Sequence, residues 1–296
     1  MPRIVHEWTL DKLKILELYL PGYLGATQSA IETIYIDGFA GPGMNQIHGT
    51  EQLVQGSPLI ALSAQSQAGD RFDRLYFIEK RKETFDELET LVASRDTEHR
   101  ATVIHGDVNV ELPRVVRQIN KRTPTFVLLD TDAIEPAWRT IEAIAAWRTE
   151  LLINFPLGMS INRNPDSAKA ARYFDSNAWR DIWEGGRVSR TSGLLKFYLG
   201  RLAELGYDQQ PEHPRLIRSD ANNNPLYYLL LASKHPAAKS IMDWVLKQPD
   251  ASGQSRLDLD FEPQKAASRP TASRPVGAPP PSCRRARPTR CGLPTA

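Results

Sequence analysis

A glycine-rich stretch is the part of this sequence whose residue types most clearly suit ligand binding. It runs Tyr35-Ile-Asp-Gly-Phe-Ala-Gly-Pro-Gly43 and includes a short apolar run. Gly38, Gly41 and Gly43 allow tight turns and let the backbone approach a ligand closely. In open α/β sheets, the turn after the first strand is a place where nucleotides bind. The same turn also occurs for purely structural reasons, so the stretch alone does not identify a site.

The residues around this turn argue against a bound pyrophosphate. Ala40 stands where the third position of a dinucleotide fingerprint has glycine. A polar loop follows, and the next predicted helix begins only at Ser57 as N-cap with Pro58 in the first helical position. A pyrophosphate needs the helix N-terminus directly after the glycines. An NAD-dependent oxidoreductase also needs an acidic residue about 20 positions on, and Glu79 lies far beyond that.

Three carboxylates fit a positively charged ligand that has no phosphate. Asp37, Glu79 and Asp107 each follow an apolar run that we expect to be a strand. S-adenosylmethionine carries a sulfonium cation, a ribose and an amino-acid end. We expect Asp37 to meet its ammonium group, Glu79 its ribose hydroxyls and Asp107 its adenine amino group. Such charge-assisted hydrogen bonds contribute roughly 1.5–3 kcal/mol each. Each carboxylate taken singly also fits a solvated loop residue or a helix cap.

The elements needed to position these residues alternate between strand and helix. Five predicted strands, each ending in a polar or acidic residue, cover residues 33–36, 75–78, 102–104, 126–129 and 151–153. Amphipathic stretches predict helices over residues 9–20 (ended by Pro21 and Gly22), 82–94, 110–120 and 136–147. This alternation is typical of βαβ units. We therefore predict an α/β fold with a doubly wound, mostly parallel sheet.

Beyond Pro156 the pattern changes. Residues 162–206 are predicted to be helical, with Trp179 and Trp183 in the core like Trp138 and Trp147 before them. Two strand-like runs flank a stretch rich in turn-forming residues, so a C-terminal β-hairpin is predicted, followed by a last helix. The predicted segments are an N-terminal helix (1–25), a Rossmann-like core (26–160), a helical insertion (161–210), the hairpin (215–218 and 226–231) with its helix inside 211–250, and a tail (251–296).

Basic charge is concentrated in the C-terminal tail. Residues 263–296 hold seven of the 37 basic residues and no acidic one, which leaves 30 basic against 35 acidic residues before them, a net charge of −5. The tail also holds eight of the 22 prolines and no aromatic residue, so it is predicted to be disordered. Its arginines suit contact with nucleic acid or anionic lipid. A solvated appendage is the simpler interpretation.

Composition also narrows the class of protein. No apolar run approaches the roughly 20 residues that span a bilayer, and the N-terminus lacks a secretory signal. The two cysteines, Cys283 and Cys291, both lie in the tail, which argues against a disulfide framework. The six histidines lack metal-ligand spacing. We therefore expect a cytoplasmic protein with no membrane partner and no metal site.

As a set, the motifs resemble those of the three-Cys-motif partner proteins (TcmP), over about residues 12–244. The resemblance is carried by the glycine-rich stretch, Gly56-Ser-Pro-Leu59, Phe77-Ile-Glu79, Gly106-Asp-Val-Asn109, Leu128-Leu-Asp130, Leu152-Ile-Asn-Phe-Pro156 and residues 225–236. That family is similar to class I S-adenosylmethionine-dependent methyltransferases. The resemblance implies a seven-stranded sheet whose last pair forms a reversed hairpin, S-adenosylmethionine as cofactor, and a separate three-Cys-motif protein as partner.

The predicted cofactor contacts lie along one edge of the sheet. They are Asp37, Gly38, Phe39, Ala40, Gly41, Gly43, Glu79, Gly106, Asp107 and Asp130.

After the fourth strand, Asp130-Thr-Asp-Ala133 departs from the family's Asp-Pro, aromatic and Gly. This point usually faces the methyl acceptor, so Asp130, Asp132 and Asn154 are the candidate catalytic residues. Asp132 is either a general base, if burial raises its pKa, or a turn residue. Asn154 with Phe155-Pro156 resembles the Asn-Pro-Pro-aromatic motif of nucleic-acid amino methyltransferases, although it follows the fifth strand.

Three functions remain open. The first is a methyltransferase with an unknown acceptor, in which orientation supplies most of the catalysis. The second is an S-adenosylmethionine-binding accessory subunit that does not turn over, which the altered segment 130–133 suggests. The third is a nucleic-acid methyltransferase, suggested by the basic tail and the Asn-Phe-Pro sequence.

Overall fold

The computed structural model describes residues 2–131, 133–156, 161, 166–211, 214–219 and 224–249. The chain divides into one unit over Met1–Asp260 and a second over Phe261–Ala296. The second unit and the whole of the predicted tail (251–296) lie outside the described residues, as does Asp132. The segment boundaries predicted from the sequence stay predictions.

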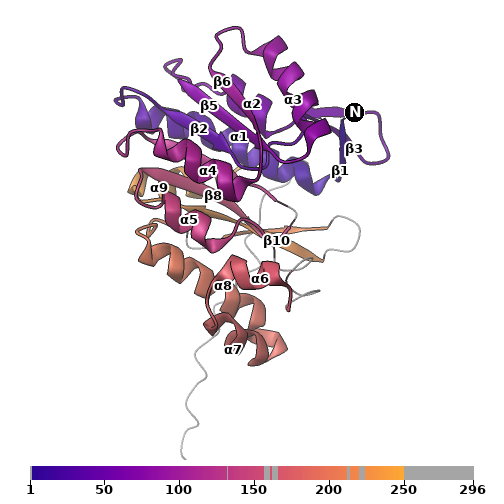
Figure 1. Ribbon diagram of the computed structural model, residues 1–296, viewed down its shortest axis with the longest axis vertical. Coiled ribbons are helices and arrows are strands. Elements are labelled where there is room, and N and C mark those ends of the chain that lie inside the picture. The colour runs from indigo at the N-terminus through magenta and orange to yellow at the C-terminus, as the bar shows by residue number, and fades with distance from the viewer. Residues whose placement is uncertain are drawn as a thin grey trace, which may run out of the picture. The chain divides into compact units, whose positions relative to one another are not determined.

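Seven strands form the central sheet of the protein (Figure 1). In space they follow the order β6-β5-β2-β7-β8-β10-β9. The five strands from β6 to β8 pair in parallel, and β10 runs antiparallel to both of its neighbours. The strands are β2 (Ile34–Asp37), β5 (Arg74–Glu79), β6 (Ala101–His105), β7 (Thr125–Leu129), β8 (Thr149–Phe155), β9 (Arg215–Arg218) and β10 (Pro225–Ala232). The predicted α/β fold, with its mostly parallel seven-stranded sheet and terminal hairpin, is confirmed.

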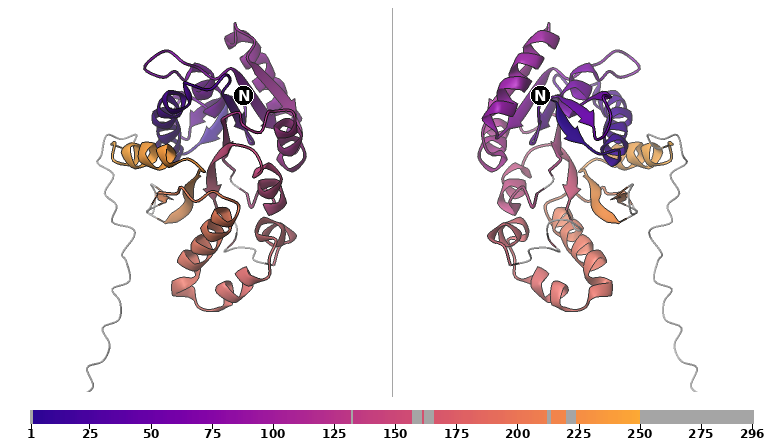
Figure 2. Two further views of the ribbon diagram at one scale, coloured as in Figure 1. Left: turned by 90° about the vertical axis from the view of Figure 1, so that its left-hand side faces the viewer. Right: turned by 90° about the vertical axis from the view of Figure 1, so that its right-hand side faces the viewer.

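Helices cover both faces of this sheet (Figure 2). Side chains alternate between the faces, so Ile36 and Val127 pack on one side while Tyr35 and Phe126 pack on the other. The first side is covered by α4 (Val108–Arg117), α5 (Trp138–Ile144), α6 (Ala168–Phe174), α7 (Ala178–Glu184) and α8 (Arg187–Glu204). The second is covered by α1 (Trp8–Thr27), α2 (Ser57–Ser63), α3 (Lys82–Arg95) and α9 (Pro236–Leu246).

The first helix is longer than the sequence predicts. It continues through Pro21 and Gly22 to Thr27, so the predicted end at Pro21 is wrong. Proline in a helix interior removes one hydrogen bond and costs about 3 kcal/mol. Burial of Tyr23 and Leu24 on the sheet offsets this cost. At Gly22 an added Cβ would lie 2.8 Å from Ile241 Cγ2, so glycine allows α1 to pack closely on α9.

A second, three-stranded sheet replaces the polar loop that was predicted after the glycines. Its strands are β1 (Arg3–Val5), β3 (Met44–Ile47) and β4 (Leu53–Gln55). β3 and β4 form a hairpin around Gly49, whose φ of +76° suits glycine. β1 pairs in parallel with β3. Residues 3–5 are therefore held beside the glycine-rich stretch.

Helix α2 starts one residue earlier than expected. Gly56 is its N-cap, and Ser57 is the first helical residue, so the prediction of Ser57 as N-cap is wrong. The side chain of Ser57 instead hydrogen-bonds to Asp37. A serine followed by a proline fits a helix in which serine is the N-cap and also one in which serine is the first helical residue. The sequence pattern therefore does not distinguish the two.

Two of the four tryptophans predicted for the core, Trp138 and Trp179, are fully buried, whereas Trp147 and Trp183 pack at its margin. Phe174 stacks on Trp179 and Tyr173 stacks on Tyr198, so aromatic contacts hold α6, α7 and α8 together. None of the helices in the described part of the chain is long and apolar enough to cross a membrane.

Candidate functional site

The strand order of the large sheet reverses between β2 and β7. From this point the chain builds β5 and β6 on one side and β8 on the other. In open α/β sheets, ligands bind outside the carboxyl ends of the strands at such a switch point. Gly38 donates its backbone N–H to the carbonyl of Leu128 at 2.9 Å, which joins the start of the glycine loop to β7.

A cavity of about 280 Å³ opens at this position. The glycine loop contributes Phe39 and Gly41, and β7 and β8 contribute Asp130 and Asn154 near their carboxyl ends. The N-terminal segment, through β1 and the first turns of α1, forms a further wall. The cavity therefore brings together one half of the predicted cofactor loop and two of the three predicted catalytic residues. The third, Asp132, lies outside the described residues.

Asp37 ends β2 beneath the loop and is completely buried. Its Oδ1 accepts a hydrogen bond from the backbone N–H of Phe39 at 3.1 Å, and its carboxyl group also bonds to the side chains of Ser57 and Tyr35. Burial raises the pKa of Asp37 to about 7, although the hydrogen bonds from Ser57 and Phe39 lower it. The buried carboxyl of Asp37 therefore keeps its proton to a higher pH than an exposed aspartate does.

Glu79 ends β5 and fixes the glycine loop from the adjacent strand. Its Oε2 accepts the backbone N–H of Gly41 at 3.0 Å, and its Oε1 accepts that of Arg81 at 2.8 Å. Gly41 has a φ of +65°, and no heavy atom lies within 4 Å of the place a Cβ would occupy. The loop therefore turns in a glycine conformation beside open space. Glu79 is accessible enough, and has lone pairs enough, to accept further hydrogen bonds.

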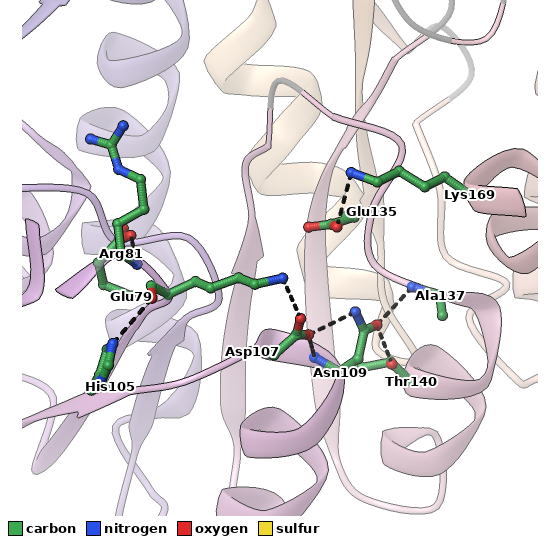
Figure 3. A network of polar contacts seen from close by, with 10 residues as sticks. Glu79, Arg81, His105, Asp107, Asn109, Glu135, Ala137, Thr140 and Lys169 are labelled. Atoms are coloured by element: carbon green, nitrogen blue, oxygen red, sulfur yellow. Dashed lines mark hydrogen bonds and ion pairs between the residues drawn. The ribbon is translucent and has the colours of Figure 1, made fainter. Parts of the chain in front are cut away.

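Asp107 follows β6 and caps helix α4. Its Oδ1 accepts hydrogen bonds from the backbone N–H of Asn109 at 2.8 Å and from the side-chain amide of the same residue at 2.9 Å (Figure 3). Lys80 Nζ lies 2.7 Å from Oδ2 of Asp107. Partial burial raises the pKa of Asp107, but the bonds from Lys80 and Asn109 outweigh it and lower the pKa. The helix-cap alternative is therefore present in the structure. A role toward adenine stays a prediction.

The three carboxylates lie on three adjacent strands, at the same edge. β2, β5 and β6 are neighbours in the sheet and end at Asp37, Glu79 and just before Asp107. The backbone N–H of Gly106 donates to the carbonyl of Glu79 at 3.0 Å, which ties the ends of β6 and β5 together. None of the three carboxylates lines the cavity. Glu79 and Asp107 lie on the β5 and β6 side of the glycine loop, whereas the cavity lies on its β7 and β8 side.

Two residues important for the site were missed by the sequence analysis. Lys12 of α1 forms an ion pair with Oδ2 of Asp130, and both side chains are largely buried. The ammonium group also lies 5.7 Å from the ring centre of Tyr227. The sequence pattern could have revealed Lys12, because a lysine in the buried stripe of a helix, here with Ile15 and Leu16 of α1, needs a partner for its charge. Ser57, misassigned as a helix cap, is the other.

Asn154 completes the wall on the side of β8. Its Nδ2 donates to Oδ1 of Asp130 at 3.2 Å. The residue is 1% exposed, and its Oδ1 has no hydrogen-bond partner within the described residues. Asp130 thus holds Lys12 with one oxygen and Asn154 with the other.

Comparison with known proteins bears on the fold. No family model matches the chain, and no curated protein matches it. The chain is similar to a Legionella pneumophila protein assigned to DUF519, with 12% identity and a TM-score of 0.50 over 80% of this chain and 92% of that chain. At this identity the likeness is one of fold. The mostly parallel seven-stranded sheet and the hairpin of its last two strands are those that the sequence resemblance implied.

Two further solved structures superpose less closely. An O-methyltransferase from Bacillus cereus in complex with SAH has 13% identity and a TM-score of 0.42, over 76% of this chain and 81% of that chain. An rRNA methylase from Streptococcus thermophilus has 11% identity and a TM-score of 0.35, over 75% of this chain and 93% of that chain.

The residues at this edge fit S-adenosylmethionine better than a phosphate-bearing cofactor. Helix α2 is separated from the glycine loop by the β3–β4 hairpin, so its N-terminus does not follow the glycines directly. Carboxylates follow or end four neighbouring strands, at Asp37, Glu79, Asp107 and Asp130. Lys80 and Lys12 pair with Asp107 and Asp130, so the preference of this row for a positive charge over a phosphate comes mainly from Asp37 and Glu79. The open space beside Gly41 leaves room for a ligand against the backbone.

Proposed function

We propose that this protein is a cytoplasmic S-adenosylmethionine-dependent methyltransferase of the three-Cys-motif partner type, with an acceptor bound in the cavity at the switch point. The observation that carries the proposal is the juxtaposition of the glycine loop, a row of carboxylates at adjacent strand ends, and a cavity that reaches Asp130 and Asn154. The cofactor supplies a methyl group already activated by its positively charged sulfur.

The chain's own residues have separate roles in this proposal. Asp37, Gly38, Phe39, Ala40, Gly41 and Gly43 hold the amino-acid end of the cofactor, while Glu79, Gly106 and Asp107 hold its nucleoside. On the opposite side of the switch point, Lys12 and Asn154 orient the carboxylate of Asp130 toward the acceptor. The segment around β1 excludes water from the cavity that it lines. Excluding water strengthens each of these polar contacts.

Ligand-dependent stabilisation tests the cofactor assignment. Thermal unfolding of the full chain is measured with S-adenosylhomocysteine and with NAD, side by side, and affinities are then obtained by titration calorimetry. A ligand that binds only the folded state raises the unfolding temperature. We expect S-adenosylhomocysteine to raise it and NAD to leave it unchanged. Stabilisation by NAD alone contradicts the proposal.

A silent accessory subunit is the second candidate, and one contact favours it. Asp130, on the acceptor side, is already engaged by Lys12 and Asn154. The partner proposed from the sequence is a protein with three cysteines. Transfer of a labelled methyl group to total cellular protein, RNA, DNA and small molecules, measured with and without that partner, separates the candidates. Turnover by the isolated chain rules out the silent subunit, and labelled RNA or DNA supports a nucleic-acid acceptor.

A further inference from the structure

The cavity at the switch point crosses four neighbouring strands of the large sheet. It begins at the loop after β2, where Phe39 and Gly41 line it, passes the ends of β7 and β8, and reaches the first residues of β10 at Leu226 and Tyr227. Because β10 runs antiparallel to β8, these residues lie at the same edge of the sheet. Three strand spacings, roughly 14 Å in all, separate β2 from β10. A ligand beside the glycine loop therefore leaves the β10 end of the cavity to a second molecule.

The β10 end of the cavity is apolar and carries aromatic rings. Trp8, the first residue of α1, packs against a small buried cluster formed by Ile217, Leu226 and Tyr227. The ring of Trp8 also stacks on that of His6, with 4.1 Å between the ring centres. These contacts hold Trp8 in place before a ligand binds, which lowers the cost of binding. Aromatic walls attract another ring more strongly than its buried area alone would.

The ion pair of Lys12 and Asp130 lies between the glycine loop and this apolar end. Asp130 directly follows β7, and Lys12 Nζ lies 5.7 Å from the ring centre of Tyr227. Both charged side chains are largely buried, so water screens them little. The carboxylate can accept a proton, and the ammonium group stabilises negative charge that develops beside it.

This pair of charges suits an acceptor hydroxyl better than an amine. A hydroxyl oxygen becomes more negative as it loses its proton, and the ammonium group of Lys12 favours that change. An amine nitrogen becomes positive as it accepts a methyl group, and a neighbouring ammonium group opposes that change. The chemistry of the wall therefore favours methylation of oxygen.

The size of the cavity and its apolar end favour a small aromatic molecule. Its volume of about 280 Å³ is at the lower end of ligand pockets, which are typically about 300–1,000 Å³. A nucleobase has polar atoms around its edge, and those turned toward Trp8 and Leu226 would lose their hydrogen bonds to water. A hydrocarbon ring loses none there.

We propose that the methyl acceptor is a small phenol, whose apolar ring lies against Trp8 and Leu226 and whose hydroxyl group lies beside Asp130. This inference deepens the proposed function and rests on it. The hydroxyl oxygen forms a bond to the methyl carbon with a lone pair, while the carbon–sulfur bond breaks and leaves its electrons on sulfur. The hydroxyl proton passes to the carboxylate of Asp130. The products are a methyl ether and S-adenosylhomocysteine.

Binding of para-cresol to the full chain saturated with S-adenosylhomocysteine tests this inference. By calorimetric titration we expect para-cresol to bind at least threefold tighter than its cyclohexanol analogue, which lacks the aromatic ring, and than adenosine. In Trp8→Leu the affinity for para-cresol should fall at least fivefold, while that for S-adenosylhomocysteine changes less than twofold. Trp244→Leu is the matched control, because Trp244 is an exposed tryptophan of α9 that does not line the cavity.

Methyl transfer tests the choice of oxygen over nitrogen. With S-adenosylmethionine, the native chain should methylate para-cresol at least tenfold faster than para-toluidine, its amine counterpart. Leu226→Ala repeats the binding measurement from β10 if Trp8→Leu does not fold. Equal affinity for the three binding probes, unchanged affinity in the variants of Trp8 and Leu226, faster transfer to para-toluidine, or no transfer to para-cresol overturns the inference alone. Failure of the native chain to bind S-adenosylhomocysteine overturns the proposed function as well.

Discussion

The backbone N–H of Gly41 lies 3.0 Å from Oε2 of Glu79 and donates a hydrogen bond to it. This contact joins parts of the predicted cofactor site that come from two neighbouring strands, since Gly41 lies in the loop after β2 and Glu79 ends β5. The carboxylate thus has a structural role before any ligand is bound. Substitutions at Glu79 must therefore be interpreted with a control for the shape of the loop.

Glu79→Ala should weaken binding of S-adenosylhomocysteine at least tenfold, or about 1.4 kcal/mol, because it removes both the ribose contact and the support of Gly41. Glu79→Gln retains one carbonyl acceptor, so its affinity for S-adenosylhomocysteine should lie between that of the native chain and that of Glu79→Ala. Calorimetry measures both. Glu89→Ala on the exposed face of α3 is the control and should bind as the native chain does. Native affinity in Glu79→Ala contradicts the assignment of Glu79.

Gly41→Ala should abolish measurable binding of S-adenosylhomocysteine while lowering stability only modestly. The left-handed backbone costs an alanine roughly 1–2 kcal/mol, and the added methyl group enters the open space beside the loop. Gly69→Ala is a matched control, because Gly69 also has a positive φ and open space but lies in a turn away from the cavity. Both variants should lose similar unfolding free energy in urea. Equal ligand affinity in the two would show that the space at Gly41 is not used.

Substitutions at Asp107 should separate its capping role from a role toward the cofactor. Asp107→Ala should cost about 1 kcal/mol of unfolding free energy through loss of the N-cap of α4. Asp107→Ser keeps a capping oxygen and should recover most of that stability. If Asp107 also binds the nucleoside, both variants lose affinity for S-adenosylhomocysteine. Recovery of affinity together with stability in the serine variant would leave Asp107 as a cap only.

Lys12→Met should destabilise the protein by roughly 1–3 kcal/mol, because it leaves the charge of Asp130 largely buried without its cation. Adding Asp130→Asn removes that charge and should restore part of the loss. Urea denaturation of the two single variants and the double variant gives the coupling energy. Additive losses would mean that the ion pair contributes nothing to stability.

The unfolding free energy should fall as pH rises from about 5 to 8, partly because of Glu150. Burial raises the pKa of Glu150 from 4.5 to about 7, against the lowering effect of bonds from Ser233 and Tyr19. Between these values the folded state binds more protons than the unfolded state, so raising the pH favours unfolding.

The full contribution of this group is on the order of 3 kcal/mol. Glu150→Gln should flatten the pH dependence measured by urea denaturation and leave a residual slope of the same sign from Asp37, whose pKa burial also raises to about 7. Glu89→Gln, on the surface, is expected to retain the native slope. An undiminished slope in Glu150→Gln would contradict this account.

The large sheet could be predicted because its central strands are buried on both faces. Continuous apolar runs such as residues 126–129 are typical of such strands, and the order of strand and helix then limits the topology. The small sheet was missed because Met44-Asn-Gln-Ile47 is short and has no clear alternation. Its strands form through pairing with one another and with β1, which lies about 40 residues away in the sequence.

The candidate site could be predicted only in part. Its carboxylates are visible in the sequence because each follows an apolar run. The predicted end of the first helix at Pro21 and the predicted capping role of Ser57 were wrong. Tertiary contacts decide both, namely the packing of α1 on α9 and the contact of Ser57 with Asp37. The roles assigned to the individual cofactor-binding residues stay predictions that the variants above can test.

The pairing of β1 with β3 also has a practical consequence for anyone producing this protein. Arg3, Ile4 and Val5 line the cavity. Foreign residues placed shortly before Arg3, such as a purification handle, would therefore lie close to the wall of the cavity, where they can obstruct ligand entry or loosen the edge strand. Recombinant forms intended for binding work should carry their handle at the carboxyl terminus, or have it removed by a protease that leaves no extra residues.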